Sequence, residues 1–222
     1  MKHKINKGSV PTLTCKLEAG ESITAQTAYV SDCTPGIQSA STGGFGKIFK
    51  RALAGENVTQ TVYKAKSAGS ITFTMPKAGS IMAYDLTGNL PILVQKPCII
   101  AYEKAIDSLT ALRRQLIGPD SKPCDFIMEQ LGGKGYAFIK VEGDLAECVL
   151  KEREYIVVPT FSVVGCKGKA TLEIGRTNLA TSDESAYQTT INGPGIVWLQ
   201  NGTEYEIMQN NSDSLRKSRK KK

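Results

Sequence analysis

The feature that most constrains the fold of this chain is an internal repeat in which several short motifs recur at one constant offset. In each copy a glycine turn leads into a short apolar segment, which is typical of a turn followed by a buried strand. The repeat predicts a duplicated β unit whose two halves pack together and bury one face of each. The matched segments are Gly79-Ser80-Ile81 with Gly143-Asp144-Leu145, Leu86 with Leu150, and Ile92-Leu93-Val94 with Ile156-Val157-Val158.

The segment before each copy also begins with a glycine. Gly69, Gly135 and Gly195 each precede a short apolar segment, so this opening occurs three times. Residues 71–75 alternate apolar and threonine side chains, the pattern of a strand with one buried face. Hydrophobic residues make up 41% of the chain, which is enough to fill a core. We therefore predict an all-β protein with a duplicated β-sandwich and at most one short helix.

One segment has helical spacing. Ile106, Leu109, Leu112 and Leu116 recur at intervals of three or four residues, as on one face of a helix. Acidic residues lie early in this segment and arginines lie late, an order that suits the helix dipole. We predict a single helix over residues 106–116.

The predicted organisation has four parts. Residues 1–12 form a flexible N-terminus, and residues 13–118 form the first β-sandwich unit. Residues 119–209 form the second unit, which packs with the first as one compact body. Residues 210–222 form a disordered basic tail.

The formal net charge of +7 is concentrated at the two ends of the chain. Nine of the 28 basic residues lie in the first seven and the last seven positions, which leaves 19 basic and 21 acidic residues elsewhere. A domain that grips a phosphate backbone usually carries a basic face on its folded body. We expect any contact with nucleic acid or an anionic surface to be weak, to use the tail and to fall with salt. The alternative is a solvated tail without a partner.

His3 is the single histidine, and it lies in the segment predicted to be flexible. Serine and cysteine triads need a positioned imidazole, and zinc or non-haem iron sites usually need one as well. We therefore predict no catalytic residues, no metal and no cofactor. None of the six cysteines forms a C-x-x-C pair, so we expect mostly buried, reduced thiols, with a disulfide or a reactive thiol as the alternative.

No apolar run reaches the roughly 18–20 residues that a membrane span needs. The first residues contain neither the hydrophobic core of a secretory signal nor the arginine-rich pattern of a transit peptide. We expect a cytoplasmic protein without a transmembrane segment.

The segment from Phe45 to Arg51 interleaves aromatic and basic side chains. Such a segment can stack on bases and contact phosphates, or lie on an anionic membrane. The alternative is that its aromatic rings pack inward or against a neighbouring subunit. Its Gly-rich start does not fit the phosphate-binding P-loop pattern. The candidate contact residues here are Gly43, Gly44, Lys47, Lys50 and Arg51.

Two further groups complete the candidate contact or pivot residues. Gly55 and Glu56 form one group, in which Glu56 is expected to pair with Arg51 across a turn. Gly193, Gly195 and Trp198 form the other. The strand pattern favours a core position for Trp198, although tryptophan is also common at protein interfaces.

The order of several short motifs resembles the altered-inheritance-of-mitochondria family. The resemblance covers the chain from about Leu13 to about Gln200. In chain order the motifs are residues 17–22 (LEAGES), Gly43-Gly44, residues 51–57 (RALAGEN), residues 78–81 (AGSI) and residues 193–200 (GPGIVWLQ).

This resemblance implies a fold like that of the tryptophan RNA-binding attenuation protein (TRAP-like), with two short double-stranded β-helix units in one chain. It also implies a ring-like homo-oligomer, with a trimer as the expected assembly, and a link to mitochondrial biogenesis in some members. It implies no established catalytic residues.

Three functions stand as hypotheses, in order of preference. The first is a non-catalytic oligomeric scaffold that binds a ligand or partner. The second is a regulatory protein that binds RNA or DNA, and the third is an enzyme that works without histidine. Fold analogy alone is weak evidence for function, so the second remains below the first.

Overall fold

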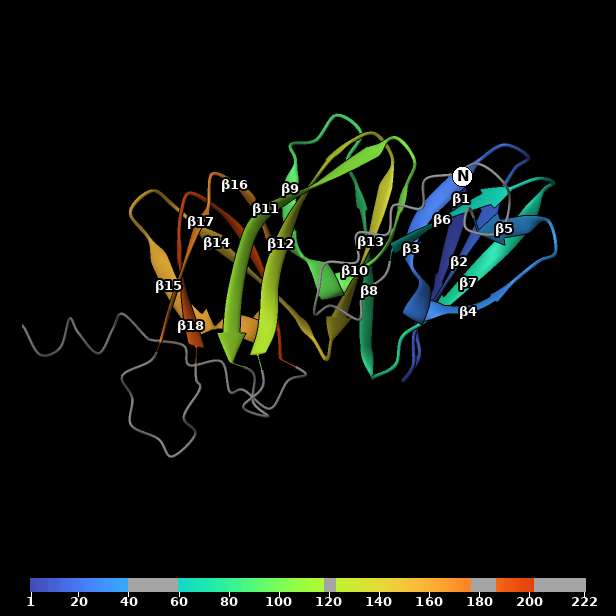
Figure 1. The fold of residues 1–222 in the computed structure, drawn as a ribbon. Coiled ribbons are helices and arrows are strands. Elements are labelled where there is room, and N and C mark those ends of the chain that lie inside the picture. Colours follow the sequence, from blue (N-terminus) through green and yellow to red (C-terminus); the bar gives the residue numbers. More distant parts are fainter. Residues whose placement is uncertain (40–59, 118–122, 177–186, 202–222) are drawn as a thin grey trace, which may run out of the picture.

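The computed structural model describes residues 1–39, 60–117, 123–176 and 187–201. Within these ranges the regular elements are β-strands and three short 3-10 turns, with no α-helix. The strands form four antiparallel sheets, A to D, that follow one another from the N-terminal to the C-terminal end of the molecule (Figure 1). The prediction of an all-β protein with sandwich packing is confirmed.

Sheets A and B hold the N-terminal half of the strands. Sheet A has the order β1 (Lys2–Asn6), β2 (Thr12–Leu17), β7 (Gly69–Thr74) and β4 (Val30–Cys33). Sheet B has the order β5 (Ile37–Ser39), β6 (Gln60–Ala65), β3 (Ser22–Gln26), β10 (Ile99–Glu103), β13 (Tyr136–Glu142) and β8 (Gly79–Asp85).

Sheets C and D hold all the remaining described strands. Sheet C has the order β11 (Ile106–Ile117), β12 (Pro123–Gly133), β9 (Ile92–Gln95), β16 (Val163–Gly168), β19 (Gly195–Gln200) and β14 (Leu145–Leu150). Sheet D has the order β15 (Tyr155–Pro159), β18 (Tyr187–Asn192) and β17 (Thr171–Arg176).

Three apolar cores fill the spaces between the sheets. Each core draws side chains from two facing sheets, because alternate residues of a strand point to opposite faces. The middle sheets are therefore buried on both faces, and β13 shows this directly: all five residues from Ala137 to Val141 are buried. Example residues are Phe73 and Ile23 for the A–B core, Ile139 and Val94 for the B–C core, and Phe126 and Ile191 for the C–D core.

The pattern of strand pairing recurs three times. In each copy a first strand (β2, β8 or β14) pairs with a second strand that begins at or directly after one of the opening glycines (β7, β13 or β19). The second strand also pairs with a third strand, which is β4, β10 or β16. The register is equivalent in all three copies: Leu17 is opposite Gly69, Leu86 bonds to Gly135 through the backbone, and Leu150 is opposite Gly195. The repeated motifs and the three glycine openings therefore mark real structural equivalence.

The number and boundaries of the units differ from the prediction. The pairing has three units, whereas the sequence analysis predicted two units, residues 13–118 and 119–209. The predicted boundary lies between β11 and β12, which pair with each other along almost their whole length. The sequence analysis did not find the first unit because β2 carries threonines at positions where β8 carries apolar residues.

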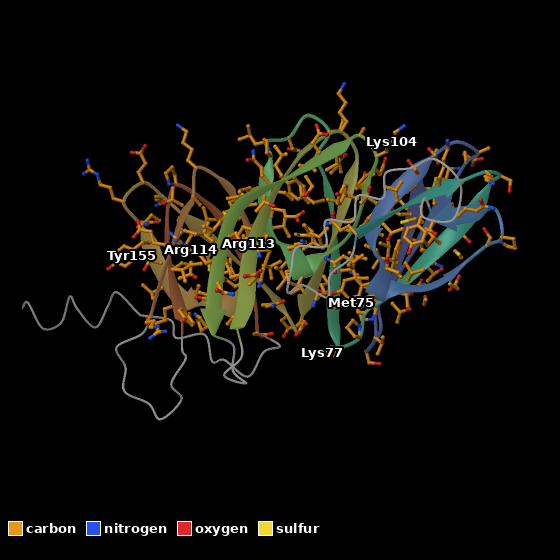
Figure 2. The ribbon with its side chains drawn as sticks, in the orientation of Figure 1. Met75, Lys77, Lys104, Arg113, Arg114 and Tyr155 are labelled. Atoms are coloured by element: carbon orange, nitrogen blue, oxygen red, sulfur yellow. The ribbon has the colours of Figure 1, made fainter. Side chains whose placement is uncertain are left out.

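The predicted helix over residues 106–116 is wrong, because this segment is strand β11. Leu109 is 62% exposed, so the helical spacing does not mark one buried face. A register shift between Thr110 and Leu112 changes the phase of the strand and produces the misleading spacing. Figure 2 shows Arg113 and Arg114 on the extended ribbon of this strand.

The prediction of a flexible N-terminus is also wrong within residues 1–12. Residues 2–6 form β1, which pairs with β2 from Lys2 opposite Lys16 to Asn6 opposite Thr12. His3 is half-buried in this strand. The predicted tail, residues 210–222, lies outside the described residues.

Three 3-10 turns carry the chain from one sheet to the next. They are η1 (Thr27–Tyr29), η3 (Lys96–Cys98) and η4 (Thr160–Ser162), and each joins the sheet that it leaves to the preceding sheet of the stack. The first two turns are linked, because Gln26 Nε2 donates a hydrogen bond of 2.6 Å to the backbone oxygen of Lys96. In the described part of the chain, no helical segment has the length and hydropathy of a membrane-spanning helix.

Candidate binding surface around Trp198

The predicted contact residues fall into two groups. Three of them, Gly193, Gly195 and Trp198, lie together at the turn before β19 and in β19 itself. The others are in residues 40–59, outside the described part of the chain: Gly43, Gly44, Lys47, Lys50, Arg51, Gly55 and Glu56.

Gly193 and Gly195 allow neighbouring backbones to approach closely. A Cβ atom at Gly193 would lie 2.5 Å from the backbone oxygen of Lys151. A Cβ atom at Gly195 would lie 2.6 Å from the backbone oxygen of Lys167. These separations are far below van der Waals contact, so the two glycines serve strand packing at this corner.

Trp198 is the anchor of the site. Its side chain is only 2% exposed and belongs to the B–C core. Its ring centroid lies 5.4 Å from that of Tyr84 on β8, in an edge-to-face arrangement. Its indole N–H donates a hydrogen bond of 3.0 Å to Glu147 Oε2 on β14. The indole is therefore held from two sheets.

Gly165 provides room for the indole. It lies opposite Trp198 in the pairing of β16 with β19, next to a register shift in β16. A Cβ atom there would lie 3.3 Å from Trp198 Cε3 and 2.4 Å from the backbone oxygen of Leu93. A side chain at this position would therefore collide with the neighbouring strand β9 and press against the indole ring.

Lys167 places a positive charge over the two rings. Its Nζ atom lies 5.6 Å from the centroid of Tyr84 and 5.8 Å from the centroid of Trp198, within the range of a cation–π interaction. Burial raises the pKa of the Tyr84 phenol, so this side chain is neutral at physiological pH. The cluster thus presents an ammonium, two aromatic rings and the Glu147 carboxylate.

A row of side chains on β14 extends this cluster to the edge of sheet C. Leu145, Glu147 and Val149 alternate along the strand and so share one face, the face that Glu147 shares with Trp198. Leu145 is 38% exposed and Val149 is 66% exposed. Val149 lies opposite Ile196 in β19. We call Trp198, Tyr84, Lys167 and this row the Trp198 surface.

Four buried or half-buried charges and one exposed lysine form two further groups of ion pairs. Lys140 Nζ lies 2.7 Å from Glu142 Oε1, and Lys77, in the turn between β7 and β8, lies 3.3 Å from Glu142 Oε2 (Figure 2). In the other pair, Lys96 Nζ lies 3.9 Å from Glu129 Oε1, with both side chains almost fully buried. Each buried charge therefore has a partner of opposite sign, as burial of a charge requires.

The two charges of the Lys140–Glu142 pair stabilise each other. Burial opposes the charge of Lys140, but Tyr29, Cys98 and the hydrogen bond to Glu142 outweigh it and raise the pKa of Lys140. Burial likewise opposes the charge of Glu142, but its contacts with Lys140 and Lys77 outweigh it and lower the pKa of Glu142.

Three of the thiols lie in the cores of the described structure. Five described cysteines are free, and Cys15, Cys98 and Cys166 are buried. Burial raises the pKa of Cys15 and Cys98 to about 12 and that of Cys166 to about 11, so all three stay protonated at neutral pH. No group of three or more metal-ligating side chains occurs within the described ranges.

Sequence reasoning identified the anchor but not its surroundings. Trp198 stood out as a core or interface tryptophan, and the structure places it in the core beside an exposed row. Tyr84, Glu147 and Lys167 come from three other strands, and no local motif connects them. The exposed apolar residues Leu145 and Val149 are visible in the sequence only as part of an ordinary strand pattern.

Comparison with known proteins agrees with this architecture. The fold defines a class of stacked antiparallel β-sandwich proteins, and the site adds an aromatic and apolar surface at one sheet edge. The chain belongs to the family described as Mitochondrial biogenesis AIM24, which matches residues 3–202. The resemblance predicted from the motifs is therefore confirmed.

One solved structure shares the fold over nearly the whole chain. It is the X-ray crystal structure of protein SPYM3_0169 from Streptococcus pyogenes, with 15% identity and a TM-score of 0.71. The alignment covers 98% of this chain and 99% of the other. At this identity the likeness concerns the fold. No curated protein matches the chain significantly.

Proposed function

We propose that this chain is a non-catalytic scaffold that binds a protein partner through the Trp198 surface. The observation that carries the proposal is the exposure of Leu145 and Val149 beside the buried Trp198. Large apolar side chains that gather at an anchored aromatic residue are typical of protein interfaces. Burying such a side chain contributes roughly 1–2 kcal/mol, so this pair supports a modest but useful affinity.

The chemistry of the surface suits recognition rather than catalysis. The Glu147 carboxylate accepts a hydrogen bond from the Trp198 indole, and the Lys167 ammonium lies over two aromatic rings. The nearest thiol in sequence, Cys148, lies on the opposite face of β14, among residues that pack against the C–D core. The proposed role therefore includes no reaction.

The proposed scaffold is a homo-oligomer, with a trimer as the expected assembly and the cytoplasm as the expected compartment. Within the described residues, β8 and β14 end their sheets, and this supports association, since unpaired strand edges readily pair with other chains. Light scattering of the purified full chain should give a mass of several subunits. A monomer at micromolar concentration would contradict this part of the proposal.

Nucleic-acid binding is a second candidate, supported by the charge of the tail. Six of the last seven residues are basic. Binding through this tail should fall steeply between low and physiological salt, because it depends on counterion release. Titration of RNA into the full chain and into a variant without residues 212–222 separates tail binding from binding by the body.

Photo-cross-linking tests the main proposal. A photoreactive amino acid at position 149 should give discrete cross-linked adducts in the cells that produce the protein. Position 109 is the matched control, because Leu109 is 62% exposed on β11, away from the Trp198 surface. Equal labelling at both positions, or none at position 149, would refute the proposed binding surface.

A further inference from the structure

Among the described residues, sheet A contains a strand that has no counterpart at the same edge of sheets B and C. This strand, β1, extends sheet A beyond β2 and covers the facing strand β13 in sheet B. The His3 ring centroid lies 4.6 Å from Tyr136 and 5.0 Å from Phe138. Ile5 of β1 packs against the same core, as does Ile81 of β8. One short strand thus shields the outer part of sheet B.

The Trp198 surface on sheet C is the structural equivalent of the face of sheet B that β1 covers. Ala83 pairs with Phe138 in the second unit, and Glu147 pairs with Trp198 in the third. Ala83 and Glu147 correspond in the sequence repeat, at the same offset as Gly79 and Gly143, so Phe138 and Trp198 are equivalent. In the second unit this face lies beneath β1.

No described strand takes the place of β1 in the third unit. β8, the counterpart of β2, is the last strand of sheet B within the described residues. Tyr84 of β8 contacts Trp198, and β19 pairs with β14. A strand added beyond β8 would therefore lie over β19 and β14, as β1 lies over β13.

The residue types on the face of sheet C that carries Leu145 and Val149 indicate that a partner covers this face when the protein functions. The first unit has an outer face that no other described sheet covers, and there the row on β2 is polar: Thr12, Thr14 and Lys16. The second unit has Ile81 and Ala83 in the equivalent row, under β1. The third unit has Leu145 and Val149, yet both are exposed.

We infer that the edge of β8 that no described strand pairs with accepts an extended segment of a partner protein as an added strand. This inference rests on the proposed function and states how the partner binds. The added strand bonds to the β8 backbone, and its inward side chains cover Leu145 and Val149. Peptides commonly bind to open sheet edges in this way.

The chemistry of the partner segment follows from β1 and from the surface. Met1, directly before β1, and Ile5, within β1, flank His3 at a distance of two residues, and both pack against the first core. On β14 the apolar residues flank Glu147, an exposed carboxylate. The matching segment has a basic residue in the middle. One apolar residue lies two positions before it, and another lies two positions after it.

A labelled peptide with the sequence of residues 1–7, MKHKINK, is a direct probe. Added to the full chain, it should slow hydrogen exchange of the amides of residues 79–85. Val149→Lys should weaken binding at least 10-fold, because it places a second positive charge against the basic peptide. Leu109→Lys removes an equally exposed apolar residue elsewhere and should leave the affinity unchanged.

Several results would overturn the inference. Unprotected β8 amides, or protection confined to β2, would show that the probe does not add a strand to β8. Equal binding by Val149→Lys would remove the Trp198 surface from the contact. Self-association that is lost in Val149→Lys would identify a second copy as the occupant in place of a partner. Cross-linking from position 149 with unprotected β8 amides would leave the proposed function standing and end this inference.

Discussion

The third position after each opening glycine holds Thr72 in β7, Phe138 in β13 and Trp198 in β19. These equivalent residues meet three environments. Thr72 lies on the outer face of sheet A, where its hydroxyl is 3.3 Å from that of Thr14. Phe138 is fully buried beneath β1, and Trp198 is 2% exposed beneath Tyr84.

In these three strands, the residue type at the equivalent position follows from whether another described sheet packs against that face. A face with no sheet above it carries threonine, which suits a strand surface in contact with water. A face beneath another sheet carries an aromatic residue that fills the core. The open part of sheet C breaks this rule, because Val149 is apolar and exposed, and this exception marks the proposed binding surface.

The largest expected effect is the loss of an aromatic anchor. Trp198→Ala should lower the free energy of unfolding by about 3–5 kcal/mol, because it leaves a large cavity in the B–C core. Thr72→Ala should cost about 1 kcal/mol or less, since it removes one partly exposed hydrogen bond. Urea unfolding of both variants measures the difference. Similar costs would mean that the two faces are not as different as their burial indicates.

The next largest effect is expected at Gly165, whose missing side chain leaves room for the Trp198 indole. Gly165→Ala should destabilise the fold by about 1–3 kcal/mol, because its Cβ would meet the backbone oxygen of Leu93 and the Trp198 ring. Gly175→Ala is the matched control, since no atom lies within 4 Å of its Cβ position. Thermal unfolding should separate the two substitutions clearly. A neutral Gly165→Ala would show that β16 lies further from β9 and from the Trp198 ring than described.

A third prediction concerns a charged residue on the covered face. Glu142→Gln should cost about 1–2 kcal/mol at neutral pH, a value reduced from that of a fully buried pair because Lys77 is solvent-exposed. The lowered pKa of Glu142 means that its contribution is present above the unfolded pKa and is lost as pH falls through the folded pKa.

The wild-type chain should therefore lose this part of its stability on acidification below about pH 4.5, the usual value for a glutamate. The variant should lack that part of the pH dependence. Denaturant unfolding at a series of pH values provides the measurement. Parallel pH profiles for the two proteins would contradict the assigned pairing.

The smallest effect on stability is expected at the exposed row. Val149→Thr should change the free energy of unfolding by no more than about 0.5 kcal/mol, because the side chain is 66% exposed. The same substitution should reduce cross-linking at the Trp198 surface when the photoreactive group is placed at Leu145. A large loss of stability would instead show that Val149 is already packed within the chain.

The sequence predicted much of the architecture, because the physical signals of strands are local. The glycine openings and the repeated motifs identified equivalent strands correctly, since close backbone packing requires glycine at the same places. The first unit was missed because its outer face is polar, so Thr12 and Thr14 do not resemble Ile81 and Ala83.

The remaining errors arose where long-range pairing decides the structure. β11 has helical spacing, but its pairing with β12 and a register shift at Thr110 make it a strand. β1 looks like a polar leader until its pairing with β2 is known. The Trp198 surface combines four strands, so only Trp198 itself was visible in advance.

Among the described residues, the face of sheet C around Leu145 and Val149 is equivalent to the face beneath β1 but has no covering strand. Deleting residues 1–6 should expose the first of these faces and leave the second unchanged. Titration of the MKHKINK peptide should then give one binding site on the full chain and two on the shortened chain. No site on the full chain and one on the shortened chain would contradict the equivalence on which the proposed binding surface depends.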